Sequence, residues 1–253
     1  MDLGLGGRKA VLVGASHGIG LATAKVLAAE GCAVALCSRS PESVRAAITA
    51  IEEAGGKAIG DPVDATDGAA HAGWIADAAG RLGGCDIFIS FTSTNPGVDD
   101  EAGWRAVFEA DILALQRGVH AALPFLRQSD AASIVTLSST AALEEFMGPG
   151  PYNALKAAVI NYSAALAQKH APEGIRVNCV SPGPIEMEGR AWDQIRSAMP
   201  DFYKGILGQI PMGRMGSGEE VGRAIAFVAS PACRFMTGAN LLIDGGFTKG
   251  VQF

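Results

Sequence analysis

The fold is decided by a short stretch near the N-terminus, Ala10-Val11-Leu12-Val13-Gly14-Ala15-Ser16-His17-Gly18-Ile19-Gly20. The apolar run at its start predicts a buried strand, and a helix is expected to begin at Gly18 and end at about Glu30. Glycines between the two let backbone N–H groups approach a pyrophosphate, which the positive end of the helix dipole also attracts. The spacing Gly-x-x-x-Gly-x-Gly differs from the commoner dinucleotide fingerprint, but its place between the first strand and the first helix indicates nucleotide binding.

The same alternation of strand and helix continues along the chain. Ser40 is the expected N-cap and Pro41 the first residue of the second helix. Further strands are expected at 33–37, 57–63, 86–89, 133–137, 176–180 and 240–243. We therefore predict an α/β fold, with a single doubly wound Rossmann-type domain over residues 1–253 and a parallel seven-stranded sheet covered by helices on both faces.

Composition and charge narrow the class of protein. Hydrophobic residues make up 49% and charged residues 18% of the 253 residues, which is typical of a well-packed globular chain. A net charge of −6 predicts neither a nucleic-acid partner nor an anionic membrane partner. The five scattered cysteines suit reduced thiols in a cytoplasmic protein, and the absence of a secretory leader pattern agrees with that location. The four distant histidines show no metal-ligand spacing, so no metal is expected.

The end of the second expected strand bears on the choice of cofactor. A carboxylate there would bind the ribose hydroxyls of NAD and repel a phosphate. This chain has Ser38 and Arg39 instead. Arg39 can form charge-assisted hydrogen bonds to a 2′-phosphate, and Ser38 offers a neutral donor. We therefore expect NADP(H), although Arg39 could also be a solvated surface residue.

Tyr152 and Lys156 stand four residues apart in a stretch that predicts a helix. This spacing puts the phenol and the ammonium group on one helix face. Because a nearby cation makes a phenol easier to deprotonate, the pair can exchange a proton near neutral pH. Ser139 lies shortly before and can help through its hydroxyl. A Tyr-x-x-x-Lys spacing also arises by chance on amphipathic helices, so it needs support from other motifs.

Such support exists, because the chain resembles the short-chain dehydrogenase/reductase family, in its single-domain 3-oxoacyl reductase-like branch, over essentially its whole length. The matching elements are Gly14 to Gly20, Asp64, Leu137-Ser138-Ser139, Tyr152 to Lys156, Arg176-Val177-Asn178, Ser181 to Ile185, Thr237-Gly238 and Asp244-Gly245-Gly246. The resemblance implies a doubly wound parallel sheet and assembly into a homodimer or homotetramer.

The resemblance also implies roles for individual residues. Tyr152 matches the acid/base tyrosine, Lys156 the lysine that favours its ionised form and holds the nicotinamide ribose, and Ser139 the serine that hydrogen-bonds the substrate oxygen. Asp64 matches the adenine contact and Ile185 the backbone contact to the nicotinamide amide. The expected cofactor-binding residues are Gly14, Ser16, His17, Gly18, Ile19, Gly20, Ser38, Arg39, Asp64, Ser90, Tyr152, Lys156, Pro182, Gly183 and Ile185.

Three positions depart from the family pattern. Ser90-Phe91-Thr92-Ser93 replaces Asn-Asn-Ala-Gly after the fourth strand, so Phe91 must find an apolar niche. Asp111 replaces the fourth catalytic residue, an asparagine, and should raise the pKa of Lys156 while weakening its effect on Tyr152 only slightly. Met187 replaces a threonine that hydrogen-bonds the nicotinamide amide, and its side chain is expected to lie within reach of the substrate. We interpret these changes as shaping the substrate site.

Residues 187–212 break the strand–helix rhythm with an apolar, irregular stretch, which predicts a substrate lid; oligomer contact or ordinary packing is the alternative. With apolar Phe146 and Met147 before the catalytic helix, it favours a hydrophobic substrate. The sequence thus predicts an NADP-dependent oxidoreductase acting on CH-OH/C=O groups (EC 1.1.1.-), a carbonyl reductase for a hydrophobic ketone or 3-oxoacyl-type compound. An NADP-linked catabolic alcohol dehydrogenase and a non-catalytic nucleotide sensor remain the alternatives.

Overall fold

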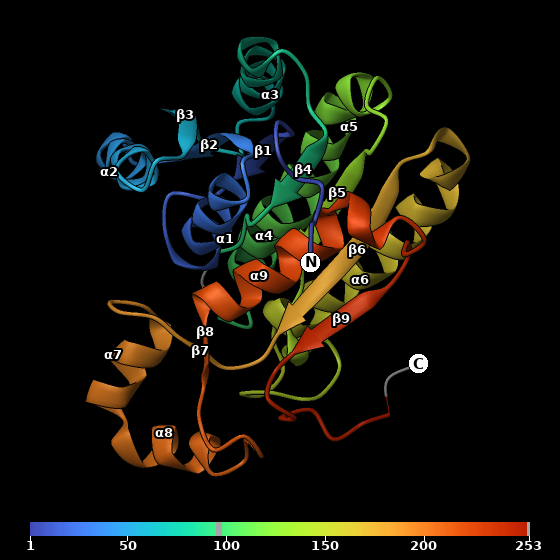
Figure 1. Cartoon of the computed structure of the whole chain (residues 1–253). Coiled ribbons are helices and arrows are strands. Elements are labelled where there is room, and N and C mark those ends of the chain that lie inside the picture. Colours follow the sequence, from blue (N-terminus) through green and yellow to red (C-terminus); the bar gives the residue numbers. More distant parts are fainter. Residues whose placement is uncertain (95–97, 252–253) are drawn as a thin grey trace.

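Seven parallel strands form the central sheet of the computed structural model, which describes residues 1–94 and 98–251 (Figure 1). Each strand pairs in parallel with its neighbours. In sheet order, the strands are β3 (Lys57–Pro62), β2 (Ala33–Ser38), β1 (Lys9–Val13), β4 (Ile87–Ser90), β5 (Ser133–Leu137), β6 (Arg176–Pro182) and β9 (Asn240–Ile243). The predicted fold class and the parallel seven-stranded sheet are confirmed.

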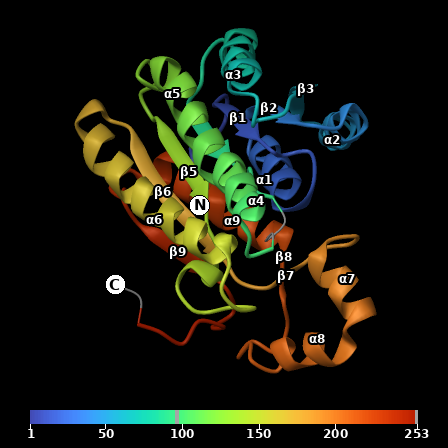
Figure 2. The ribbon, with the colours of Figure 1, turned by 180° about the vertical axis from the view of Figure 1, so that it is seen from behind.

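Helices cover both faces of the sheet (Figures 1 and 2). The helices on one face are α1 (Gly18–Ala29), α2 (Pro41–Glu52) and α9 (Gly218–Ala229). Those on the other face are α3 (Gly68–Leu82), α4 (Glu101–Val107), α5 (Ala114–Leu126) and α6 (Pro151–His170). Within the described ranges, no helix is both long enough and apolar enough to cross a bilayer.

Each face of the sheet has its own apolar core because successive strand residues point to opposite sides. In β1, Val11 packs in the core beneath α3 and α5, whereas Leu12 packs in the core beneath α1 and α9. Phe88 and Ile89 of β4 divide in the same way. Burial on both sides explains why these strands appear as continuous apolar runs in the sequence.

The boundaries predicted from sequence agree with the structure to within two residues at each strand end. The second helix begins as expected, with Pro41 in its first turn and the Ser40 hydroxyl accepting a hydrogen bond from the Ser43 backbone N–H at 3.2 Å.

The 187–212 segment lies outside the sheet. The chain leaves β6 through a short strand, β7 (Ile185–Glu186), forms α7 (Ala191–Ala198) and α8 (Pro200–Leu207), and returns through β8 (Gly216–Ser217), which pairs with β7. Figure 1 shows that α7 and α8 stand apart from the sheet, beyond the N-terminal end of α9. In doubly wound sheets ligands bind at the carboxyl ends of the strands, so the functional site is expected there.

Candidate active site

The catalytic groups expected from sequence meet where β5 ends and α6 begins. Ser139 follows β5, and Tyr152 lies in the first turn of α6. Lys156, one helical turn later, places its Nζ 5.6 Å from the centre of the Tyr152 ring. Ser139 and Tyr152 line the same cavity, which has a volume of about 430 Å³. Ser138 has a structural contact instead, since its hydroxyl donates to the backbone carbonyl of Lys156 at 2.8 Å.

Lys156 forms a buried ion pair with Asp111. The Nζ–Oδ2 distance is 2.9 Å, and the two side chains are 4% and 0% exposed. The same Asp111 oxygen accepts from the Ser93 hydroxyl at 3.1 Å, and Lys156 also donates to the carbonyl of Leu137 at 3.2 Å. Burial alone lowers the pKa of Lys156, but the negative charge of Asp111, with a smaller effect of Tyr152, outweighs burial and raises it. Lys156 therefore remains cationic, as expected.

Asp111 reaches Lys156 from an unusual backbone. Residues Phe108–Leu113 form a π-helix between α4 and α5, and Asp111 is buried within it. Such wide turns are frequent at functional sites. The second carboxylate oxygen of Asp111, Oδ1, is buried and has no hydrogen-bond partner among the residues described. The departure from asparagine thus adds a charge inside the site.

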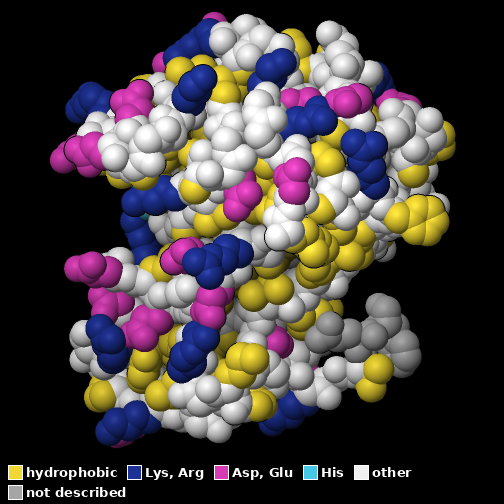
Figure 3. Space-filling model, in the orientation of Figure 1, with side chains coloured by type: hydrophobic (Ala, Val, Ile, Leu, Met, Phe, Trp, Pro, Cys, Tyr) yellow, Lys and Arg dark blue, Asp and Glu magenta, His cyan; other side chains and the backbone are white. Residues whose placement is uncertain are grey.

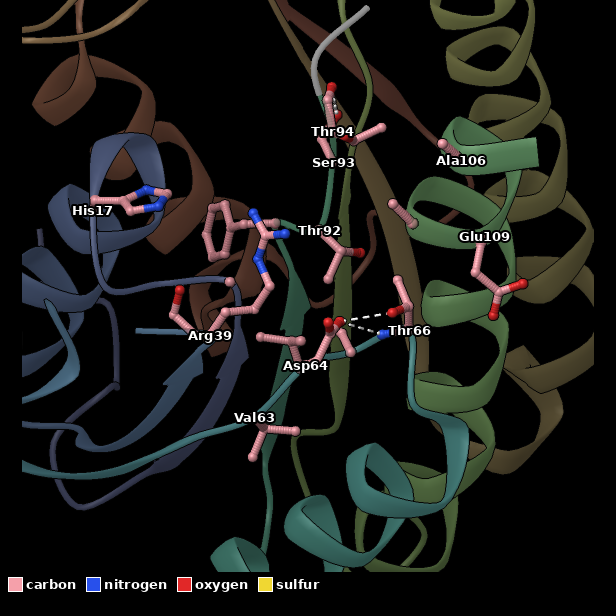
Figure 4. Close-up of a pocket in the computed structure, with 16 residues that line it drawn as sticks. His17, Arg39, Val63, Asp64, Thr66, Thr92, Ser93, Thr94, Ala106 and Glu109 are labelled. Atoms are coloured by element: carbon pink, nitrogen blue, oxygen red, sulfur yellow. Dashed lines mark hydrogen bonds between the residues drawn. The ribbon is translucent and has the colours of Figure 1, made fainter. Parts of the chain in front are cut away.

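A second cavity, of about 400 Å³, lies at the carboxyl ends of β1, β2 and β3 (Figure 4). Arg39 points into it between His17 and Asp64 (Figure 4). Burial, together with the positive charges of Arg190 and Arg39, lowers the pKa of His17. Hydrogen bonds from Thr66 lower the pKa of Asp64, with a smaller contribution from Arg39.

This cavity has the features of a site for the phosphates of a nucleotide. Gly14 has a φ of +76°, and a Cβ there would lie 3.2 Å from the carbonyl carbon of Phe91. A Cβ on Gly20 would lie 2.7 Å from Cα of Ala15. These glycines let β1, the loop and α1 pack closely, leaving the N-terminus of α1 facing the cavity, where a phosphate is favoured. Arg39 makes no salt bridge with any described residue and so can bind an anion.

A model of the family described as Enoyl-(Acyl carrier protein) reductase matches residues 14–248. The chain belongs to the short-chain dehydrogenase/reductase family. It is 32% identical to isoepoxydon dehydrogenase patN of Aspergillus clavatus over 98% of both chains. It is 33% identical to 2,5-dichloro-2,5-cyclohexadiene-1,4-diol dehydrogenase LinX of Sphingobium indicum, again over 98% of both. The solved structure of L-sorbose reductase from Gluconobacter frateurii, in complex with NADPH and L-sorbose, superposes with a TM-score of 0.91 at 26% identity, covering 99% of this chain and 100% of that one.

In this family member, some of the predicted cofactor residues line the two cavities and others do not. Gly14, His17, Ser38, Arg39 and Asp64 line the nucleotide cavity, and Gly183 lines the cavity beside Tyr152. Apart from Tyr152 and Lys156, described above, the other predicted cofactor residues line neither of these two cavities. The Ser16 hydroxyl lies 2.9 Å from that of Ser43, the Ser90 hydroxyl lies 2.9 Å from that of Thr92, and Ile185 is buried in the core; Gly18, Ile19, Gly20 and Pro182 are in α1 and β6.

The positions that depart from the family pattern do not all line the site. Phe91 finds an apolar niche in the core beneath α1 and lines the nucleotide cavity, and Ser93 lines both cavities. Met187 was expected within reach of the substrate, but among the described residues it does not line the cavity beside Tyr152. A Cβ on Gly218 would lie 2.8 Å from the Met187 sulfur, and a Cβ on Gly18 would lie 3.7 Å from the Met187 methyl carbon. Met187 therefore packs where α1 and α9 begin.

Sequence reasoning missed two residues that the structure brings to the site. Glu109 lines the nucleotide cavity opposite His17 (Figure 4) and pairs with Arg117. Phe247 lines the cavity beside Tyr152, although it follows the last strand. The π-helix that turns Glu109 inward has no recognisable sequence signal. Phe247 directly follows Asp244-Gly245-Gly246, a matched family motif, but nothing in the sequence predicted that the chain folds back there.

Proposed function

We propose that this family member is an NADP(H)-dependent oxidoreductase that reduces the carbonyl of a hydrophobic ketone to a secondary alcohol. The observation that carries the proposal is the Ser139–Tyr152 pair in one cavity, with the cationic Lys156 beneath the Tyr152 ring. Two relatives are named as dehydrogenases, one of them of a ring diol, and the sorbose reductase structure contains NADPH. These names agree with carbonyl and alcohol chemistry.

The chain's residues have distinct tasks in this reaction. Bound NADPH would supply the hydride and its two electrons to the carbonyl carbon. The Ser139 hydroxyl hydrogen-bonds the oxygen as its negative charge grows, and Tyr152 transfers its phenolic proton to that oxygen. Lys156 stabilises the phenolate that Tyr152 leaves behind until a proton returns from solvent. Asp111 fixes Lys156 by their ion pair. Run in reverse, the same groups oxidise an alcohol, so the site supports a catabolic dehydrogenase equally.

The proposal also covers the preference for NADP, the role of the 187–212 segment as a substrate lid and the cellular location. Arg39 with Ser38, without a carboxylate at the end of β2, supports NADP over NAD. The 187–212 segment supplies Ala191, Trp192 and Ile195 to the cavity wall, which supports a lid role. The five buried free cysteines support a cytoplasmic setting. A homodimer or homotetramer stays a prediction, which sedimentation of the purified protein tests.

The proposal is tested with Tyr152→Phe. Loss of the proton donor is expected to reduce NADPH-dependent ketone reduction by about 10²- to 10⁴-fold, whereas NADPH binding, followed by its fluorescence, persists. Tyr162→Phe, on the same helix but absent from the described cavity linings, serves as the control and should retain activity. Equal reduction rates in the two variants would leave Tyr152 without a catalytic role. NADPH binding without turnover in the unmodified protein would instead favour a nucleotide sensor.

A further inference from the structure

Part of the wall of the cavity beside Tyr152 is aromatic, formed by Phe146, Trp192 and Phe247. The rings of Phe146 and Trp192 lie 6.2 Å apart at 51°, and those of Phe146 and Phe247 lie 6.4 Å apart in an edge-to-face arrangement. Trp192 stacks on Phe202 of α8 at 6.4 Å. Three separate parts of the chain thus converge: the loop before α6, the helices of the 187–212 segment and the C-terminal tail. Their flat aromatic surfaces complement a compact ring better than a flexible chain, which would lose more freedom on binding.

Two carboxylates fix the tail that carries Phe247. Asp244 accepts from the backbone N–H groups of Gly246 and Thr248, both at 2.9 Å, and so closes a tight turn around Phe247. Glu144 accepts from the backbone N–H groups of Lys249 and Gly250 at 2.8 and 3.1 Å. Glu144 comes from the loop that follows Ser139, so it ties the tail directly to the catalytic loop. Phe247 is therefore a built part of the wall.

The charge of the substrate is also restricted. Among the residues that the structure describes, those lining the cavity beside Tyr152 include no Asp, Glu, Lys, Arg or His. An anionic group entering it would lose hydration without gaining a counter-charge. Glu144, Glu145 and Lys249 line a smaller cavity that shares Phe146 and Phe247 with it, so its two carboxylates outnumber its one cation. A substrate carried on a phosphate-bearing thioester arm therefore meets no counter-charge among the described residues that line the cavity beside Tyr152.

Combining these observations, we infer that the substrate is a neutral, compact monocyclic ketone or the matching ring alcohol, and that Phe247, positioned by Glu144, determines this preference. The inference rests on the proposed hydride transfer at Tyr152. The ring carbonyl carbon takes up the hydride and its two electrons, and the carbonyl oxygen takes the Tyr152 proton. The products are the ring alcohol and oxidised cofactor.

The substrate class is tested with matched ketones and NADPH. Cyclohexanone is expected to have a kcat/KM at least about tenfold above that of hexan-2-one, which has the same number of carbon atoms in an open chain. 4-Methylcyclohexanone is expected to exceed 4-oxocyclohexanecarboxylate by about a hundredfold, because the latter brings an unpaired charge. Comparable values for ring and open chain, or for neutral and anionic rings, would overturn the inference while leaving the proposed hydride transfer intact. Absence of reduction of every ketone would overturn both.

The residue assignment is tested in the same assay. Phe247→Ala is expected to lower kcat/KM for cyclohexanone about tenfold and to change hexan-2-one less than about twofold. Phe235→Ala removes an exposed phenylalanine that lines neither the nucleotide cavity nor the cavity beside Tyr152. It should leave kcat/KM unchanged for both ketones. If Phe247→Ala lowers kcat/KM for both ketones equally, Phe247 does not set the preference.

Glu144 acts through the tail and is tested separately. Glu144→Ala is expected to raise KM for cyclohexanone several-fold with little change in kcat, and to speed hydrogen exchange of the Lys249 and Gly250 amides. Glu144→Gln keeps an oxygen acceptor and should restore KM at least partly. Faster exchange without a change in KM would show that the tail does not position the cavity wall.

Discussion

Arg39 faces the nucleotide cavity from the end of β2, the position at which an acidic residue would favour NAD. Arg39→Ala is expected to raise the KM for NADPH by about tenfold to a hundredfold and to leave the KM for NADH nearly unchanged, because only NADPH loses a charge-assisted hydrogen bond. Initial rates with both cofactors measure the effect. Arg45→Ala, an exposed arginine on the neighbouring α2, is the control. Equal losses with NADPH and NADH would contradict a phosphate-binding role.

Asp111 neutralises the only cation that lies beside Tyr152 among the described residues. Asp111→Asn removes the negative charge that offsets the field of Lys156 at the Tyr152 ring, so the Tyr152 phenolate should be favoured more strongly. The rising limb of the pH–rate profile for alcohol oxidation is expected to move to lower pH by about one unit.

The matched control for Asp111→Asn is Glu101→Gln, which removes an exposed carboxylate from the preceding helix. Its pH profile should coincide with that of the unmodified protein. An Asp111→Asn profile that stays in place, or moves to higher pH, would show that the ion pair does not tune the proton transfer.

At the scale of an element, the C-terminal end of α9 depends on one side chain from β6. The Arg176 guanidinium donates to the carbonyls of Val228, Ala229 and Ser230 at 2.7 to 3.0 Å. The last carbonyls of a helix have no partner within the helix, so Arg176 satisfies groups that would otherwise be buried without one.

Arg176→Ala is accordingly expected to lower the free energy of unfolding by about 3 kcal/mol. Chemical denaturation measures this change. Arg223→Ala removes an exposed arginine from the same helix, whose pair with Glu219 lies at the surface, and should cost less than about 1 kcal/mol. Similar losses for the two variants would contradict the capping role of Arg176.

For the whole molecule, a buried histidine sets a pH limit on stability. His71 of α3 is fully buried against α5, and neither of its ring nitrogens has a hydrogen-bond partner among the described residues. Burial, with a smaller effect of Arg117, lowers the pKa of His71 to about 4. Below about pH 6.5 the unfolded chain binds a proton that the folded chain refuses, so stability is complete above that pH and falls progressively towards pH 4.

The expected loss at His71 is about 3 kcal/mol between pH 7 and pH 4. His71→Leu removes the titrating group, so its free energy of unfolding should fall less steeply over this range, whatever its value at neutral pH. His120→Gln, on the exposed side of α5, should keep the steep fall. Parallel pH curves for the unmodified protein and His71→Leu would be inconsistent with this source of acid sensitivity.

Much of the molecule was predictable because its signals are local. Strands buried on both faces appear as apolar runs. Tyr152 and Lys156 share a helix face because of their spacing alone, whatever the helix packs against. Contacts made at a distance along the chain were not predictable. The site of Met187 depends on how α9 packs on α1, and Phe247 enters the cavity because Glu144, about a hundred residues earlier, binds the tail.

The short ladder between β7 and β8 has a consequence for engineering. Ile185 pairs with Gly216 and Glu186 with Ser217, so the chain enters and leaves the 187–212 segment at adjacent points. Parallel neighbours lie about 4.8 Å apart, which is a small gap for any replacement to bridge. The whole stretch between the two strands can therefore be treated as an interchangeable cassette. Chimaeras that carry the corresponding stretch of a relative should keep the catalytic scaffold and acquire a new repertoire of substrates.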